Sequence, residues 1–190
     1  MTYREELLEL LYRLSYEERA VTLTSGKKSN YYVDGKQTSC HARGSFLVGQ
    51  LFYERISAKA KAAGISIKGV GGLTMGADPI VSSISVVSVL HNDPLHAFLI
   101  RKEPKGHGKQ LWIEGDKNFK PGDAVAIVED VVTSGGSLLK AIERAQAHDL
   151  QVVQALTLVD RLEGGAELLR EHGIEVEALF TIEDLKSFKG

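Results

Sequence analysis

The sequence predicts an α/β fold: a mostly parallel twisted sheet flanked by helices, with a hairpin and a helix forming a hood at the N-terminus. Two observations predict it. From Ile65 onward, strand-like and helix-like segments alternate, which is the order expected of a parallel sheet. The strand-like segments are apolar and bounded by loops, which indicates that both faces of the sheet are covered. We expect a single domain over 1–190, with the hood at approximately 1–40 and the core at approximately 41–190.

The hood is expected to begin with an amphipathic helix, because Leu7, Leu11 and Leu14 recur at helical spacing among glutamates. The stretch AVTLTSGKKSNYYVDG has β-type residues on both sides of a Ser-Gly-Lys-Lys-Ser turn, so it predicts a hairpin. Residues 41–63 contain no proline and are rich in Ala, Leu, Phe and Ile. They predict a helix that ends at Gly64.

The core elements follow in chain order. ISIKGVGGL predicts a short strand that runs into glycines. Asp78 is a plausible N-cap before Pro79, so a helix is expected there, although the β-branched run behind it also suits a strand. Further strands are expected at 96–101, 123–130, 152–160 and 176–180, and helices at 135–148 and 164–173. The polar stretch KEPKGHGKQ has no apolar face to bury and is expected to be a mobile loop.

Composition narrows the class of protein. Hydrophobic residues (43%) and charged residues (25%) occur in the proportions of an ordinary globular protein, and the net charge of -2 argues against an extended nucleic-acid-binding surface. Cys40 is the one cysteine, so we expect a reducing, cytoplasmic location and a core or surface thiol rather than a nucleophile. The charged N-terminal stretch argues against a signal peptide or a membrane span, and the six histidines lack zinc-ligand spacing.

The stretch VAIVEDVVTSGGSLLKAI combines a strand, two acids, a glycine-rich turn and a helix. Glu129 and Asp130 end the strand, where we expect their carboxylates to be solvated. The turn Thr133–Ser137 offers backbone N–H groups and hydroxyls that can converge on an anion at the positive end of the helix. The acids would repel a phosphate, so a ribose diol or a hydrated magnesium ion is their expected partner. A plain helix N-cap beside exposed acids is the alternative.

This stretch resembles the phosphoribosyl pyrophosphate (PRPP) signature of the type I phosphoribosyltransferase family. The resemblance implies that the two acids face the ribose and that the turn holds the 5'-phosphate. It also implies Mg²⁺ as cofactor, held mainly by PRPP and water near the acids, with no direct protein ligand. The PRPP-binding residues that it implies are Arg101, Lys102, Lys105, His107, Glu129, Asp130, Val131, Val132, Thr133, Ser134, Gly135, Gly136 and Ser137.

Residues 99–109, LIRKEPKGHGK, resemble the catalytic loop of the orotate phosphoribosyltransferase family. In that family the matching arginine, lysines and histidine contact the pyrophosphate. Cations delivered by such a loop would stabilise the charge that grows as pyrophosphate leaves. The resemblance makes Lys105, His107 and Asp130 the candidate catalytic residues. A solvated basic turn is the alternative for the loop.

The strand end TLVDR resembles the family segment whose arginine pairs with the orotate carboxylate. This makes Arg161 a candidate orotate-binding residue, since a guanidinium matches a carboxylate bidentately. The family resemblance gives Thr133 as the other candidate orotate-binding residue. The alternative for Arg161 is a surface ion pair with Asp160 or Glu163. The hairpin resembles the segment that helps cover the base, so Tyr32 and Val33 either approach the orotate ring or pack across the hairpin.

Three segments depart from the family pattern. Thr24 stands where several members carry a lysine before the Ser-Gly of the hairpin. Thr74 and Met75 stand where some members have a Tyr-Lys pair, so any pyrophosphate contact there must come from the backbone of 72–76. Trp112 lies in a stretch that is one residue longer than usual, and we expect it to be a packing anchor under the loop.

The resemblance runs from about Leu23 to Arg161. It implies transfer of the 5-phosphoribosyl group from PRPP to orotate, giving orotidine 5'-monophosphate and pyrophosphate in de novo pyrimidine (UMP) biosynthesis. It also implies a homodimer in which the loop 101–112 is shared across the interface. Two rivals remain. A purine-specific relative should need neither the loop cations nor Arg161, and a PRPP-sensing regulator that binds nucleic acid should bring a DNA-binding domain or a basic face.

Overall fold

The computed structural model describes residues 1–22, 28–105 and 111–188. These residues form a six-stranded sheet in the order β10-β9-β8-β5-β6-β7. Neighbouring strands are parallel except at one edge, where β7 runs antiparallel to β6. The strands are β5 (Ile67–Leu73), β6 (His96–Lys105), β7 (Leu111–Glu114), β8 (Ala124–Val132), β9 (Gln151–Asp160) and β10 (Val176–Thr181). The predicted α/β fold with a mostly parallel sheet is confirmed.

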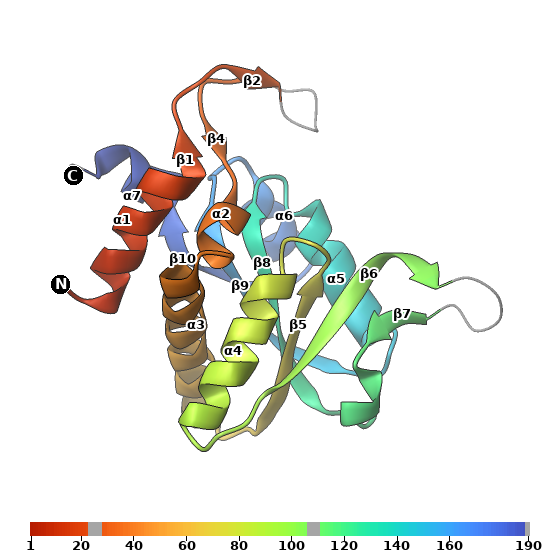
Figure 1. The fold of residues 1–190 in the computed structure, drawn as a ribbon. Helices are drawn as coiled ribbons and strands as arrows, with labels where there is room; N and C mark the ends of the chain where they lie inside the picture. Colours follow the sequence, from red (N-terminus) through yellow and green to blue (C-terminus); the bar gives the residue numbers. More distant parts are fainter. Residues whose placement is uncertain (23–27, 106–110, 189–190) are drawn as a thin grey trace.

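Helices cover both faces of this sheet (Figure 1). Helices α3 (Ala42–Ala63) and α4 (Asp78–Leu90) pack on one face, and α5 (Gly136–Gln146) with the short α6 (Gly165–Glu171) on the other. A buried apolar cluster lies on each face. Burial on both faces explains why the strands read as apolar runs rather than as alternating patterns.

The hood confirms the predicted helix and hairpin. Helix α1 begins with a capping box, in which the Thr2 hydroxyl accepts from the Glu5 N–H and the Glu5 carboxylate accepts from the Thr2 N–H. The hood elements are α1 (Tyr3–Ser15), β1 (Tyr16–Glu17), β2 (Val21–Thr22), β3 (Lys28–Ser29), β4 (Tyr32–Val33) and α2 (Gly35–Ser39). Strands β1 and β4 pair antiparallel, as do β2 and β3. The turn of the hairpin, with Thr24, lies outside the described residues.

The remaining elements are short. They are the 3₁₀ turn η1 (Asp116–Asn118) and the helix α7 (Ile182–Ser187), which packs beside α1 (Figure 1). Apolar side chains of α1, α7 and β4 belong to the same buried cluster as α3 and α4. The hood is therefore packed against the core. None of the helices in the described ranges has the length and apolarity that crossing a bilayer requires.

Some predicted boundaries were wrong. The N-cap residue of α4 is Ala77. Asp78 is the first residue of the helix, and its side chain does not cap it. The expected loop from 102 onward continues as strand β6 as far as Lys105, because the unpredicted strand β7 pairs with it. Helix α2 was also not predicted. Residues 106–110, which include His107, lie outside the described part of the chain.

The glycines of β5 permit close packing in the middle of the sheet. A methyl group at Gly71 would collide with the ring of Phe98, and one at Gly72 would collide with the carbonyl oxygen of Val128 and the side chain of Ala77. Gly71 and Gly72 therefore let α4 and the neighbouring strands approach the β5 backbone.

Gly71→Ala should lower the free energy of unfolding by about 1–3 kcal/mol, because the added methyl group overfills the space beside Phe98. Denaturant titration measures the change. Gly136→Ala is the matched control, since nothing lies within 4 Å of the added atom there. Equal stability of the two variants would contradict this account of the packing.

Candidate active site

A cavity of about 420 Å³ lies where β8 and β9 end, between the core and the hood. Ligand pockets commonly measure about 300–1,000 Å³ and, in such sheets, lie at the carboxyl ends of the strands. The cavity is lined by Tyr32, Val33, Lys36, Lys102, Glu129, Asp130, Val131, Val132, Thr133, Ser134, Gly135, Gly136, Ser137, Leu138 and Arg161. The whole stretch from Glu129 to Ser137 therefore comes together with Lys102 and Arg161.

The turn between β8 and α5 presents backbone N–H groups to this cavity. Gly135 has φ +79, a left-handed conformation that glycine adopts without strain, and no described side chain caps α5. The first N–H groups of the helix therefore stay available for a ligand, with the positive end of the helix dipole behind them. Gly165 allows the loop after β9 to pack against this turn, since a methyl group there would lie 2.8 Å from the Thr133 carbonyl oxygen.

Glu129 and Asp130 are buried, so the expectation that they are solvated was wrong. They are 6% and 9% exposed, because β8 continues past them to Val132 instead of ending there. One Glu129 oxygen, Oε2, has no hydrogen-bond partner among the described residues. Burial, and then the neighbouring Asp130, raise the pKa of Glu129 well above its ordinary value of 4.5. The unpartnered oxygen can accept a hydrogen bond from a ligand, and a bound cation would offset the cost of burying the charge.

Lys36 is a cavity residue that sequence reasoning missed. Its ammonium lies 2.6 Å from Asp34 Oδ1 and 3.7 Å from Asp130 Oδ2. Burial lowers the pKa of Lys36, but the hydrogen bond to Asp34 and the charge of Asp130 outweigh it and raise that pKa overall. Asp34 caps α2 through the Lys36 N–H, so the Asp-Gly-Lys sequence was the signal for this helix.

Lys102 and Arg101 point in different directions, as successive strand residues do. Lys102 lines the cavity, whereas Arg101 is absent from the described lining and pairs with Glu114 Oε1 at 3.1 Å. Arg101 continues the face of β6 on which Ala97 and Leu99 pack against the cluster containing α4. Strand β6 extends to Lys105, whose side chain lies outside the described atoms.

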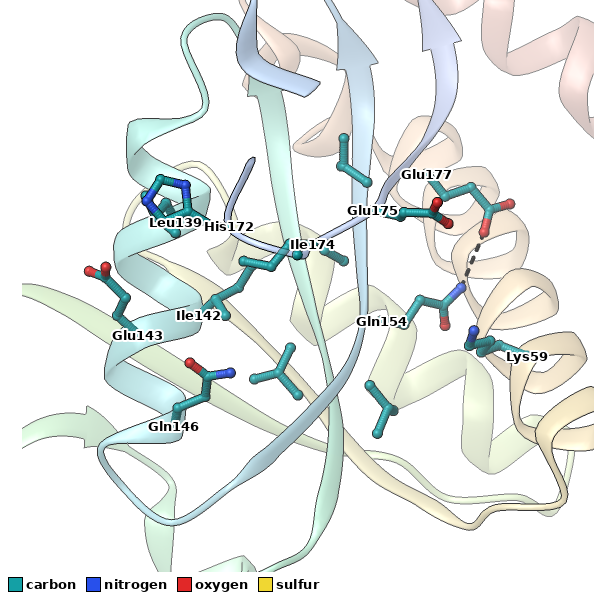
Figure 2. A pocket seen from close by; sticks show the side chains of 15 residues that line it. Lys59, Leu139, Ile142, Glu143, Gln146, Gln154, His172, Ile174, Glu175 and Glu177 are labelled. Carbon is teal, nitrogen blue, oxygen red and sulfur yellow. Dashed lines mark hydrogen bonds between the residues drawn. The ribbon is translucent and has the colours of Figure 1, made fainter. Parts of the chain in front are cut away.

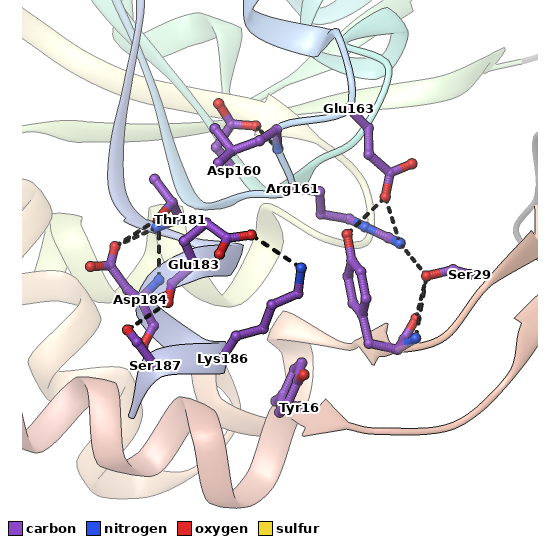
Figure 3. Close-up of polar contacts among 12 residues, drawn as sticks. Tyr16, Ser29, Asp160, Arg161, Glu163, Thr181, Glu183, Asp184, Lys186 and Ser187 are labelled. Atoms are coloured by element: carbon purple, nitrogen blue, oxygen red, sulfur yellow. Dashed lines mark hydrogen bonds and ion pairs between the residues drawn. The ribbon is translucent and has the colours of Figure 1, made fainter. Parts of the chain in front are cut away.

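Arg161 forms the ion pair with Glu163 that was its alternative interpretation, but the arginine is buried instead of lying at the surface. It is 4% exposed, and its Nη2 lies 2.8 Å from Glu163 Oε1 and 3.2 Å from Ser29 Oγ (Figure 3). Its Nε has no described partner, and its guanidinium lies over the ring of Tyr31 at 4.6 Å. The ion pair lies within the core, and Ser29 and Tyr31 connect it to the hood.

Tyr31 connects this cluster further. Its hydroxyl donates to Glu163 Oε1 at 2.9 Å, and the ammonium of Lys186 lies 5.0 Å from its ring. Tyr32 and Val33 pair with β1 and also line the cavity. Their approach to the orotate ring stays a prediction. The predicted positions of Trp112 and Cys40 are also consistent. Trp112 packs partly buried against the core, and Cys40 is an exposed thiol.

A larger hollow of about 930 Å³ lies elsewhere, between α5 and α3 across β9 (Figure 2). Its charged lining consists of Lys59 and three glutamates, Glu143, Glu175 and Glu177. It contains no helix N-terminus and no arginine. An excess of carboxylates would repel a polyanion, so the smaller cavity is the better candidate for the chemistry expected here.

A hydrated cation fits beside Glu129 and Asp130 better than a metal held only by protein ligands. Within the described ranges, no three His, Cys, Asp or Glu residues are grouped to hold a metal. Two adjacent carboxylates and the unpartnered Glu129 oxygen suit Mg²⁺, which keeps several waters and shares its ligands with a phosphate substrate. Residues 72–76 pass close to these acids, since a side chain at Gly76 would collide with the Asp130 carboxylate.

Comparisons with known proteins point to one family. The family model of the phosphoribosyl transferase domain matches residues 71–177. An orotate phosphoribosyltransferase of Nostoc sp. is 44% identical over 97% of this chain and 86% of its own length. The crystal structure of Mycobacterium tuberculosis orotate phosphoribosyltransferase with Fe(III) dicitrate has a TM-score of 0.78 at 37% identity, covering 97% of this chain and 99% of that chain. A PRPP complex of the same enzyme has a TM-score of 0.74 at 34% identity, with the same coverage.

Glu129→Gln should stabilise the fold above pH 4.5 and have little effect below it. Because the folded-state pKa of Glu129 is raised, the native state binds more protons than the unfolded state between pH 4.5 and that higher pKa. Wild-type stability therefore falls as pH rises through this window, and glutamine removes the fall.

The expected gain at pH 8 is about 1–3 kcal/mol, the usual cost of a buried group without a partner. Denaturant titrations at several pH values measure it, with the exposed Glu167→Gln as control. A gain that does not depend on pH would contradict the raised pKa.

Proposed function

This chain belongs to the orotate phosphoribosyltransferases of the phosphoribosyltransferase family, and from this premise we propose which of its residues perform the reaction. The enzyme transfers the 5-phosphoribosyl group from PRPP to orotate, giving orotidine 5'-monophosphate and pyrophosphate in pyrimidine biosynthesis. One observation carries the assignment of residues. Paired acids, an uncapped helix, Lys102 and Arg161 line a single cavity.

The turn Thr133–Ser137 binds the 5'-phosphate. The turn lines the cavity and α5 has no described side-chain cap, so backbone N–H groups there are available to a phosphate, and the hydroxyls of Thr133, Ser134 and Ser137 add donors. Val131 and Val132 support this turn from the end of β8. The PRPP complex of the M. tuberculosis relative supports a donor site in this fold.

Glu129 and Asp130 face the ribose of the donor. Carboxylates accept hydrogen bonds from a ribose diol, and the unpartnered Glu129 Oε2 is available for such a bond. When Mg²⁺ is bound, it neutralises charge on the pyrophosphate and helps it to leave. PRPP and water supply most of its ligands, with the two acids nearby. Lys36 lies 3.7 Å from Asp130 and holds that carboxylate in place.

Cations at the end of β6 stabilise the leaving pyrophosphate. Lys102 lines the cavity of its own chain. Lys105, His107 and Arg101, which are not among the described lining residues, complete the proposed set. Negative charge grows on the pyrophosphate as the C1'–O bond breaks, so these cations bind the transition state more strongly than the ground state. The reaction is a displacement at C1' through an oxocarbenium-like transition state, with Lys105, His107 and Asp130 as the catalytic residues.

Arg161 binds the orotate carboxylate, with Thr133, Tyr32 and Val33 around the ring. The buried guanidinium already holds one carboxylate, that of Glu163, and its Nε lacks a described partner. A planar fork of this kind can bind a second carboxylate. A purine has no carboxylate to offer, so this arginine discriminates between the two classes of base.

The same proposal includes a homodimer that shares residues 101–112 between subunits. Arg101 is not among the described lining residues of its own chain's cavity and pairs with Glu114 on β7 instead. On α4, Val86, Val89 and Leu90 are 66%, 60% and 69% exposed, and no charged residue follows Asp78 on this helix. An apolar helix face of this kind suits a second copy of the chain.

Residues 1–190 are proposed to act as one domain in the cytoplasm, where the exposed Cys40 thiol stays reduced.

The test of the function is a spectrophotometric assay of orotate consumption with PRPP and Mg²⁺. Hypoxanthine, adenine and uracil are run beside orotate as competing acceptors. Consumption of orotate alone is expected. Transfer to a purine at a similar rate, or no transfer to orotate, would refute the assigned acceptor.

Arg161→Ala should raise the KM for orotate by at least an order of magnitude while the KM for PRPP changes little. The lost contact corresponds to about 2–4 kcal/mol of transition-state stabilisation. Steady-state kinetics with each substrate varied in turn measure the effect. Arg170→Ala, exposed on α6, is the control. An unchanged orotate KM would remove Arg161 from the acceptor site.

Val89→Glu should convert the dimer to a monomer, because it places a charge on the exposed apolar face of α4. Sedimentation or light scattering measures the mass. Lys140→Glu, an exposed change on α5, is the control and should stay dimeric. A variant that keeps the dimer mass would exclude this face from the interface.

A further inference from the structure

Arg144, near the end of α5, contacts the backbone of Arg101 and Lys102, two of the residues proposed to bind the leaving pyrophosphate. Its Nη1 donates to the carbonyl oxygen of Arg101 at 2.6 Å, and its Nη2 donates to that of Lys102 at 3.3 Å. Its guanidinium also lies over the ring of Trp112 on β7, 4.0 Å from the centroid. One side chain thus joins α5 to both strands of the β6–β7 pair.

These carbonyl groups lie in an irregular part of the sheet. The pairing of β6 with β7 contains Ile100 opposite Ile113 and Lys105 opposite Leu111, and the register shifts between these pairs. Residues 101–104 therefore fall outside the regular ladder. Backbone carbonyls that leave a ladder need other donors, and a planar guanidinium with several N–H groups can serve two of them at once.

We propose that Arg144 is a positioning residue for the reaction, and this inference rests on the proposed function. Arg144 fixes the backbone at Arg101 and Lys102, so that Lys102 is directed into the cavity of its own chain and Arg101 to the opposite face. The residue does not touch the substrates. It acts through the two cations whose carbonyl groups it holds.

The placement of Arg144 on α5 gives the contact its significance. The same helix begins at the turn that binds the 5'-phosphate, and eight residues of helix place Arg144 about 12 Å further along. The helix is a rigid spacer between the phosphate at one end of the donor and the cations at its other end. Trp112 supports the guanidinium through a cation–π contact.

The experiment compares Arg144→Gln, Arg144→Lys and Lys140→Gln. Lys140 is the matched control, because it is an exposed cation one turn earlier on the same helix. For each variant we would measure the unfolding midpoint, kcat, and the KM for orotate and for PRPP. Trp112 is the one tryptophan of the sequence, so its fluorescence during titration with magnesium PRPP reports the contact directly.

Arg144→Gln should lower kcat about 10- to 100-fold, as expected when catalytic groups shift by about 1 Å. The KM for orotate should stay within about twofold, because Arg161 is untouched. The emission change of Trp112 on adding magnesium PRPP should shrink. Arg144→Lys should share most of the loss, since an ammonium keeps the charge but not the planar fork. Lys140→Gln should behave as wild type.

Wild-type kcat in Arg144→Gln would overturn the inference. So would a fall in kcat matched by an equal rise in the KM for orotate, because that pattern indicates general damage to the site. If the glutamine variant does not fold, the lysine variant decides, and full activity in it would contradict a role for the fork. An inactive wild-type protein would instead refute the proposed function and this inference together, whereas active wild type with fully active Arg144 variants refutes the inference alone.

Discussion

Two neighbouring carboxylates, Glu129 and Asp130, are buried at the end of β8, and much of the surrounding structure follows from the space and charge that they require. A methyl group at Gly35 would lie 3.1 Å from Asp130 Cβ, and a side chain at Gly76 would collide with the Asp130 carboxylate. Glycine at both positions lets two separate backbone segments approach the acids. Lys36 supplies the nearby positive charge. Buried charge without such partners would be costly, so the site is organised around this pair.

The order of the elements could be predicted because local sequence determines it. The strands of the core are apolar runs, and the strand, acids and glycine turn in one stretch indicate a phosphate site from the chemistry of a few adjacent residues. The depth of the acids could not be predicted in this way. Whether a strand-end carboxylate is solvated depends on the segments that cover it, and those segments, near Gly35 and Gly76, are distant in the sequence.

The same limit explains the other differences. Lys36 reaches the cavity from a five-residue helix, too short for a periodic pattern, although Asp34 gives the capping signal. The pairing of β6 with β7 continues strand structure through a polar stretch, which the absence of apolar residues had suggested would be a loop. Arg161 was assigned correctly to this end of the sheet, but its burial beneath Tyr31 depends on the hood.

The contacts of Arg161 have a consequence for folding. Ser29 and Tyr31 are each 132 residues away in the sequence from the partners that they bind, Arg161 and Glu163, whereas the phosphate-binding turn consists of consecutive residues. Contacts that link the hood to the core open whenever the hood alone unfolds, whereas a turn of consecutive core residues can stay intact. Local unfolding of the hood would therefore abolish selectivity for the base before it weakened binding of the sugar phosphate. Amide exchange should be faster in the hood than in β8 and β9. Selection of the base, which depends on hood contacts, would then be lost more readily than binding of the sugar phosphate.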